Sequence, residues 1–246
     1  MIDPQNLAEN RPSMLGRIMA GIAEHCPDVP SGPIDDAPTP DEPGHPEYHR
    51  RQRAEVALNR WRTAVPYRYR DATTTHPDIQ TWADRAVTDT HDAGFLVLIG
   101  PIGTGKTHQA YGALRRIAEA GPRRFEMIAV TAPDMYGLLR PGGSDKSSEH
   151  ELKRLCRVPL LLLDDLGTEK LSEFTEEATY RLLNERYNQC LPLIVTTNLP
   201  VRTPAGCNDP DLVSRLGDRL ASRVAQAAAI VTLTGPDLRR QNRNAA

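Results

Sequence analysis

One stretch decides the fold that we predict for this chain: Gly100-Pro101-Ile102-Gly103-Thr104-Gly105-Lys106-Thr107. An apolar run at residues 95–99 precedes it, and a helical pattern begins near Lys106. A strand, a glycine-rich loop and a helix with the spacing G-x-x-x-x-G-K-[ST] are typical of a phosphate-binding loop, or P-loop. The glycines let the backbone approach a phosphate, and the loop amides and the helix N-terminus attract its charge. We therefore predict that residues 100–107 bind a phosphate-bearing ligand.

The side chains at the end of this loop have separate expected roles. Lys106 can reach the β- and γ-phosphates of a nucleotide, and the Thr107 hydroxyl can bind Mg²⁺. We add the adjacent His108 to the residues that contact the nucleotide.

Length, charge and cysteine content narrow the class of protein. A chain of 246 residues can bury a core for one domain of ordinary size plus an extension. The formal net charge of -2 gives no overall nucleic-acid signature, so any such site must be a local patch. The chain has no long apolar run and no signal peptide, so we expect a cytoplasmic protein without a membrane partner. Its four cysteines form no Cys-x-x-Cys pair, which disfavours a zinc site.

The first 65 residues differ in composition from the rest, so we treat 1–65 and 66–246 as separate domains. Residues 14–22 have helical spacing, and the segment 26–46 is a proline-rich acidic linker that we expect to be flexible. Residues 49–70 are rich in arginine, and Trp61, Tyr67 and Tyr69 are interleaved with the arginines. They could track and stack on nucleic acid. We prefer the other interpretation, a solvated helix at about residues 47–63 whose Trp61 packs on the next domain.

Strand and helix patterns alternate through residues 66–246, which predicts an α/β fold with a parallel sheet between two helix layers. The expected strands are residues 95–99, 125–130, 160–163, 193–196 and 230–233. Helices are expected near residues 76–87, 106–120, 133–139, 148–157, 176–190 and 215–224. We expect Thr175 to be the N-cap of the long helix that starts at residue 176.

Polar side chains follow two of these strands, where ligands of a parallel sheet bind. Asp164 and Asp165 follow four leucines in the manner of a Walker B motif. We assign Asp164 to Mg²⁺ and Asp165 to activation of the attacking water. Asn198 follows the next strand, where it can contact the γ-phosphate or that water. With the P-loop, these residues predict an ATP and Mg²⁺ site.

Basic side chains near the C-terminus are candidates for a further cation at the phosphates. Arg215, Arg219 and Arg223 recur every four residues, which predicts one helix face. Nucleotide-hydrolysing P-loop proteins can receive an arginine from a partner molecule. Arg239 could also reach the phosphates from the C-terminal side.

Six motifs occur together in a familiar order: GPIGTGKTH, LLLLDDLGTEK, TEEATYRLLNERYNQ, LIVTTNLP, LGDRLASRV and TGPDLRR. Over about residues 66–240 the chain resembles the DnaC/DnaI-type AAA+ helicase loaders, a group that includes the IstB-type transposition helper ATPases. The resemblance implies a five-stranded parallel AAA+ core in which the P-loop and Walker B strands lie side by side. It also implies a homo-oligomer with ATP sites at subunit interfaces. The partners would be a hexameric DnaB-type replicative helicase and single-stranded DNA.

The resemblance also implies roles for individual residues. Asn198 matches the sensor 1 position. Arg223, with Arg219 beside it, matches the arginine-finger helix, and Arg239 matches sensor 2. Residues 133–157 occupy the place of an extra helix that touches single-stranded DNA, with Lys146, Lys153 and Arg154 as candidate contacts.

The sequence departs from the family pattern in two places. Walker B ends Asp164-Asp165 instead of Asp-Glu, and the shorter side chain favours slow hydrolysis that suits a switch. The N-terminal region matches the family poorly, so helicase binding there follows from position alone. We expect an ATP-dependent helicase loader in a bacterium or a phage-infected cell. The alternatives are an IstB-type transposition helper ATPase and a nucleotide-gated scaffold with negligible hydrolysis.

Overall fold

The structure is a computed structural model that describes residues 14–25, 37–170, 172–204, 207 and 209–238. Its contacts divide the chain into two compact units, Met1–Thr39 and Pro40–Ala246. In the first unit the structure describes helix α1 (Met14–His25), on which Met14, Leu15 and Ile18 are exposed. Within the described residues, no helix is both long and apolar enough to cross a membrane.

The second unit is built on a parallel sheet. Its strands are β1 (Phe95–Ile99), β2 (Met127–Thr131), β3 (Leu160–Leu166), β4 (Leu193–Thr197) and β5 (Ala228–Thr232). They lie in the order β2-β3-β4-β1-β5, and every neighbouring pair is parallel. The expectation that the P-loop and Walker B strands are neighbours is therefore wrong, because β4 pairs with both and separates β1 from β3. This order places the residue after β4, Asn198, between the two motifs.

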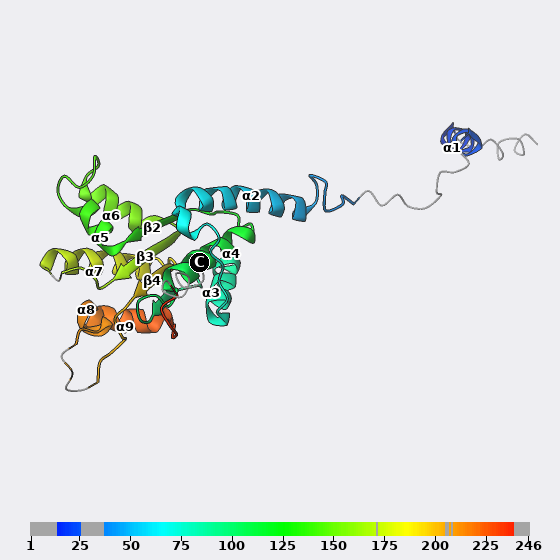
Figure 1. The fold of residues 1–246 in the computed structure, drawn as a ribbon. Helices are drawn as coiled ribbons and strands as arrows, with labels where there is room; N and C mark the ends of the chain where they lie inside the picture. Colours follow the sequence, from blue (N-terminus) through cyan, green and yellow to red (C-terminus); the bar gives the residue numbers. More distant parts are fainter. Residues whose placement is uncertain (1–13, 26–36, 171, 205–206, 208, 239–246) are drawn as a thin grey trace, which may run out of the picture. The chain divides into compact units, whose positions relative to one another are not determined.

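Helices cover both faces of the sheet (Figure 1). One layer contains α2 (Pro46–Ala64), α3 (Pro77–Thr88) and α4 (Lys106–Glu119). The other contains α5 (Ala132–Leu139), α6 (Ser148–Arg157), α7 (Glu173–Asn188) and α9 (Asp218–Ala227). Leu96 and Leu98 of β1 pack into the first layer, and Phe95, Val97 and Ile99 pack into the second. Each strand of the centre is thus buried on both faces, as its continuous apolar sequence requires.

Helix α2 packs inside the second unit. Trp61 is 1% exposed, and its indole N–H donates to the Tyr111 carbonyl of α4 at 3.2 Å. Arg53 and Arg60 donate to the Gly121 and Phe125 carbonyls at 3.0 and 2.9 Å. We expected the ATPase domain to begin at residue 66, but the compact unit begins at Pro40 and includes α2. Trp61 is the anchor that we anticipated for this helix.

Two helix starts differ from the sequence expectation. The N-cap of α7 is Ser172, not Thr175, and Thr175 is the partner in a capping box that begins the helix three residues earlier. The three C-terminal arginines do not share one helix. Arg215 belongs to α8 (Leu212–Leu216), which ends before Gly217, where φ is 73°, and a separate helix, α9, then begins. The prediction that Arg215 and Arg219 lie on one helix face is therefore wrong.

One buried arginine joins four segments of the core. Arg186 of α7 is fully buried and donates to the carbonyls of Leu155, Cys156, Val158, Pro159 and Pro192. Burial lowers the pKa of Arg186 to about 10, so the guanidinium stays charged at neutral pH. Its donors satisfy the carbonyls at the end of α6, which a helix leaves without partners.

Candidate nucleotide-binding site

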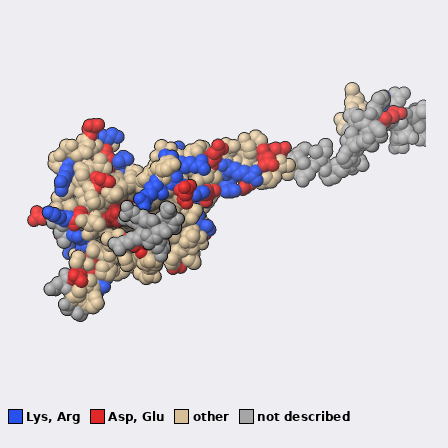
Figure 2. Space-filling model, in the orientation of Figure 1, with Lys and Arg blue, Asp and Glu red and all other residues tan. Residues whose placement is uncertain are grey.

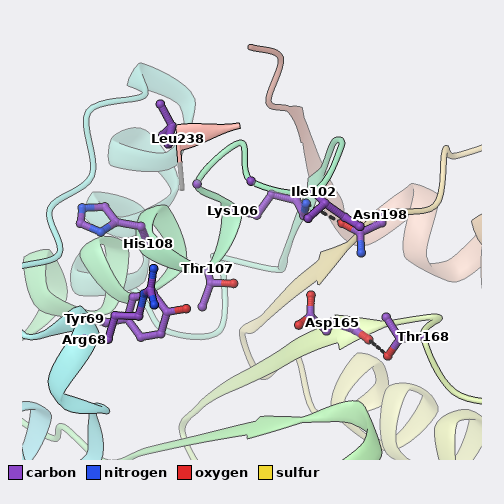
Figure 3. A pocket seen from close by; sticks show the side chains of 12 residues that line it. Arg68, Tyr69, Ile102, Lys106, Thr107, His108, Asp165, Thr168, Asn198 and Leu238 are labelled. Carbon is purple, nitrogen blue, oxygen red and sulfur yellow. Dashed lines mark hydrogen bonds between the residues drawn. The ribbon is translucent and has the colours of Figure 1, made fainter. Parts of the chain in front are cut away.

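The P-loop connects β1 to α4 and holds its lysine through oxygen atoms. The Lys106 ammonium donates to the Gly100 and Pro101 carbonyls at 2.8 Å each, and to the Asn198 side-chain oxygen at 2.7 Å (Figure 3). Gly103 and Gly105 have φ of 86° and 88°, which only glycine adopts without strain. Asn198 reaches the P-loop lysine because β4 lies beside β1. Its expected contact with the γ-phosphate or the attacking water stays a prediction.

Asp164 lies at the carboxyl end of β3 beside the P-loop helix. The hydroxyl of Thr107 lies 3.0 and 3.2 Å from its two carboxylate oxygens, and Thr196 of β4 donates to it at 2.5 Å. Burial raises the pKa of Asp164, while the Thr196 hydrogen bond opposes that rise. We did not anticipate the contact between Thr196 and Asp164, because it depends on which strand lies beside β3. The pairing of β3 with β4 brings the two side chains together.

These oxygens fit a magnesium ion. A hydroxyl and a buried carboxylate are ligands that Mg²⁺ accepts, and a divalent cation would offset the cost of the buried charge. Among the described residues, no group of three or more His, Cys, Asp or Glu side chains could hold a metal by itself. Magnesium needs no such cage, because it keeps several waters and takes further oxygens from phosphates.

Asp165 faces the same site although it is the neighbour of Asp164. Side chains of successive strand residues normally point to opposite faces. Here the pairing of β3 with β4 shifts between Leu163 and Leu166, and Asp165 has φ of 56°. Its amide donates to the Thr196 hydroxyl at 2.9 Å. This bulge re-aims the strand end, so both carboxylates reach the edge where nucleotide chemistry was predicted.

A cavity of about 760 Å³ extends from the P-loop between these groups. Its walls include the expected Ile102, Gly103, Gly105, Lys106, Thr107, His108, Asp165 and Asn198. Arg68, Tyr69, Thr168 and Leu238 also line it, and the sequence did not assign them there. Arg68 and Tyr69 belong to the short 3-10 helix Tyr67–Tyr69, and Tyr69 stacks on Tyr111 of α4 at 5.0 Å. No spacing rule connects this segment to a loop more than thirty residues later in the chain.

The remaining loop residues support the cavity from outside. Gly100 and Pro101 accept hydrogen bonds from Lys106, and the Thr104 hydroxyl donates to the Pro101 carbonyl at 2.9 Å. The imidazole of His108, besides lining the cavity, accepts from the Thr73 amide at 3.4 Å.

A segment after β5 crosses the P-loop. The Leu233 amide donates to the Ile99 carbonyl at 2.7 Å, and the Leu238 amide donates to the Gly103 carbonyl at 3.0 Å. A Cβ at Gly103 would lie 2.0 Å from a carboxylate oxygen of Asp237, so the contact is close. The next residue, Arg239, lies outside the described residues, and its expected role stays a prediction.

The other expected cations lie away from the cavity. The Arg223 guanidinium lies over the Tyr187 ring, 5.5 Å from its centre, whereas Arg219 is exposed. Arg215 donates to the Gly167 and Glu169 carbonyls at 3.0 and 3.1 Å and so holds the loop after β3. None of the three lines the cavity of its own chain. Of the expected DNA contacts, Lys153 and Arg154 pair with Glu149 and Glu151, and Lys146 is exposed.

Comparison with known proteins identifies the family. The model of the IstB-like ATP binding protein family matches residues 48–246. The chain belongs to this family. Its core is an AAA+ P-loop NTPase fold, a five-stranded parallel sheet between helices. As a member, it is an ATP-binding protein of the group that includes the DnaC and DnaI loaders.

Individual relatives come from two settings. A Mycobacterium tuberculosis protein described as an ATP-binding protein in an insertion sequence is 28% identical over 155 residues, covering 62% of this chain and 59% of the relative. The replicative helicase loader DnaI of Bacillus subtilis is 26% identical over 152 residues, covering 58% and 47%. The chain therefore spans about half the length of these curated relatives.

Solved structures agree on the fold. The crystal structure of the DnaC helicase loader has a TM-score of 0.56 and 25% identity, covering 69% of this chain and all of that chain. The crystal structure of DnaI has a TM-score of 0.50 at 22% identity, covering 75% and 93%, and at that identity it supports the fold alone.

Proposed function

We propose that this protein is a slow, Mg²⁺-dependent ATPase that uses nucleotide binding and hydrolysis as a switch. The observation that carries the proposal is that Lys106, Thr107 and Asn198 line one cavity at the strand ends, where Asp164 contacts the Thr107 hydroxyl. Lys106 and Thr107 begin α4 after β1, Asp164 belongs to β3 and Asn198 follows β4, so only the folded sheet assembles them.

Each group has a task in hydrolysis that follows from its position. Lys106 and the loop amides bind the phosphates, and Asn198 holds the lysine on the side of β4. Thr107 and Asp164 would hold Mg²⁺, which when bound neutralises phosphate charge. Asp165 would orient a water and accept its proton at a carboxylate oxygen. Because its side chain is shorter than that of glutamate, this proton acceptor stands farther from the phosphates, which favours slow turnover.

We propose a homo-oligomer in which a neighbouring copy completes the site. Within one chain, neither Arg219 nor Arg223 lines the cavity, so a cation from this helix can reach a nucleotide only from another copy. The exposed Arg219 suits this role better than Arg223, whose guanidinium already lies on Tyr187.

For the biological task we propose loading of a hexameric replicative helicase onto single-stranded DNA. The likeness to the DnaC helicase loader, which extends over all of that chain, supports this task. A second support is α1, whose Met14, Leu15 and Ile18 are exposed and offer apolar side chains to another protein, because helices as short as twelve residues gain most of their stability from packing. The helicase would be that partner.

The transposition helper function is the second candidate. The family model and the relative from an insertion sequence favour it. Co-precipitation of the full chain with a DnaB-type helicase and with an IS21-type transposase separates the two. Association with the helicase alone supports the loader, and association with the transposase alone contradicts it.

The ATPase itself is tested by Lys106→Ala in the full chain. Loss of the ammonium should reduce ATP turnover by at least about 100-fold, the usual effect of removing a transition-state donor. Lys170→Ala, which removes an exposed lysine outside the cavity, should turn over normally. Normal turnover by Lys106→Ala would contradict the site assignment, and negligible turnover by the unmodified protein with Mg²⁺ and DNA would favour a nucleotide-gated scaffold.

A further inference from the structure

A second cavity, of about 690 Å³, lies at the end of the sheet opposite the nucleotide site. Its floor is Met127 and Ile128, the first residues of β2, and Val158, which precedes β3. In a parallel sheet the amino ends of the strands lie away from the carboxyl ends, where the P-loop is. One wall comes from α2 and the other from α6. We call this cavity the amino-end groove.

Basic side chains dominate the lining of the amino-end groove. They are Arg60, Arg124, His150, Lys153, Arg154 and Arg157, against one acidic residue, Glu126. A chain whose net charge is -2 does not gather cations in this way through composition alone. Figure 2 shows basic side chains along α2, with acidic ones among them.

Local carboxylates neutralise only part of this charge. Arg124 pairs with Glu126 at 3.1 Å, Lys153 with Glu149 at 3.7 Å, and Arg154 with Glu151 at 2.8 Å. Among the residues that the structure describes, Arg60 and Arg157 form no ion pair with a carboxylate. These two therefore give the groove its uncompensated charge, one from each wall.

The fold does not require the positive charge of either arginine. Arg60 donates to the Phe125 carbonyl at 2.9 Å, which fixes its direction but leaves its charge. Arg157 is the last residue of α6, where a cation commonly serves the free carbonyls. Here Arg186 already donates to the Leu155 and Cys156 carbonyls, so the helix end does not depend on Arg157.

We propose that the amino-end groove binds the phosphodiester backbone of a nucleic-acid strand. Arginine matches phosphate oxygens with two parallel donors, and cations on both walls suit a polyanion that runs between them. The described lining contains no Phe, Tyr or Trp on which bases could stack. The contact is therefore to the backbone and independent of base sequence. This inference rests on the proposed function, an ATPase that acts on DNA, and adds α2 to the DNA-contacting surface.

An acidic protein segment fits the groove less well. A peptide would gain most of its affinity by pairing along the open edge of β2, which runs from Met127 to Thr131. Only the first two residues of that strand line the groove. The basic side chains surround the start of β2. A nucleic-acid backbone can cross there, but a peptide has too few residues of the strand to pair with.

The test uses the full chain with Arg60→Ala and Arg157→Ala combined. The control, Arg62→Ala with Arg85→Ala, loses the same charge at exposed positions on α2 and α3 outside the groove. Fluorescence anisotropy with a labelled single strand and with the matching duplex gives affinity as a function of salt. We expect the groove variant to lose affinity roughly tenfold or more, with a salt slope lower by about 1.4 for a single strand. The control should bind like the unmodified protein.

Several results would overturn the groove assignment. These are equal affinities of groove and control variants, no binding of either nucleic acid by the unmodified protein, or displacement of DNA by polyglutamate at equal charge. The last outcome would assign the groove to an acidic protein. ATP turnover without DNA should be normal in the groove variant, because both arginines lie outside the nucleotide cavity. A failure of the ATPase proposal would instead appear in the Lys106→Ala assay, so the two failures are distinguishable.

Discussion

The Lys106 ammonium lies 2.7 Å from the side-chain oxygen of Asn198, and this contact joins the P-loop to the end of β4. The lysine belongs to the strand–loop–helix unit that binds phosphate, and the asparagine lies beside the carboxylates of β3. A substitution at Asn198 should therefore affect both the Lys106 ammonium, which we expect to bind the phosphates, and the position of the attacking water.

Asn198→Ala should reduce ATP turnover more than ATP binding. The variant keeps the P-loop amides and Lys106, which supply most of the affinity, but loses the amide that orients the lysine and the water. We expect turnover to fall by about 100-fold or more, since removal of one preorganised polar group commonly has such an effect. Steady-state turnover and titration with a fluorescent ATP analogue measure the two quantities. An equal loss in both would mean that Asn198 serves binding alone.

Mixing two inactive variants tests the arginine from a neighbouring copy. Lys106→Ala and Arg219→Ala should each be inactive, but at equal amounts a mixture should recover up to about a quarter of the normal activity. In a head-to-tail assembly, that is the share of interfaces with both groups intact. Arg223→Ala should stay active, because it loses a contact with Tyr187 worth only about 1 kcal/mol. The role would belong to Arg223 if Arg219→Ala is active, and if Arg223→Ala is inactive alone but recovers activity when mixed with Lys106→Ala.

Two helical glycines should respond to alanine with opposite signs. A Cβ at Gly112 of α4 would lie 2.2 Å from the Thr73 backbone, so the helix or that backbone would have to shift. Gly112→Ala should therefore lower the free energy of unfolding by roughly 1–3 kcal/mol despite alanine's better helix propensity. At Gly137 of α5 a Cβ meets nothing within 4 Å. Gly137→Ala should therefore raise the free energy of unfolding by about 0.5–1 kcal/mol. Urea unfolding checks both, and the same sign for the two would contradict this account of α4 packing.

Asp211 should make stability depend on pH at the acidic end. Amide hydrogen bonds from Ser214 and Thr203 hold the pKa of Asp211 below its usual range. Because the folded-state pKa is the lower one, the stabilisation is complete above the unfolded value, about 3.9, and is lost as pH falls through the folded value. Asp211→Ala should have a lower Tm than the unmodified protein at neutral pH, and the difference should shrink below about pH 4.

Thermal unfolding across this pH range measures the effect. Asp209→Ala is the control, because Asp209 is exposed and, among the residues that the structure describes, accepts only from the Cys207 thiol. If the Tm difference between Asp211→Ala and the unmodified protein stays constant at acidic pH, the Asp211 carboxylate is not the group that caps α8.

The sequence by itself determined the local units of this protein. The P-loop, the two aspartates after four leucines and the strand–helix alternation are short-range patterns, and each fixed its element to within a few residues. Their shared placement at the carboxyl ends of the strands followed from the parallel sheet, whatever the strand order. The family pattern in the same motifs correctly indicated the AAA+ fold.

The tertiary structure alone decided which strands are neighbours and what surrounds the site. Strand order depends on pairings between distant residues, and the apolar runs of β1, β3 and β4 are too alike to encode it. That order brought Thr196 to Asp164, and the bulge after Leu163 turned Asp165 to the same edge. Packing of α2 and α6 around the start of β2 likewise assembled the amino-end groove from arginines far apart in the chain. Such sites arise from contacts between segments, for which a local sequence pattern carries no signal.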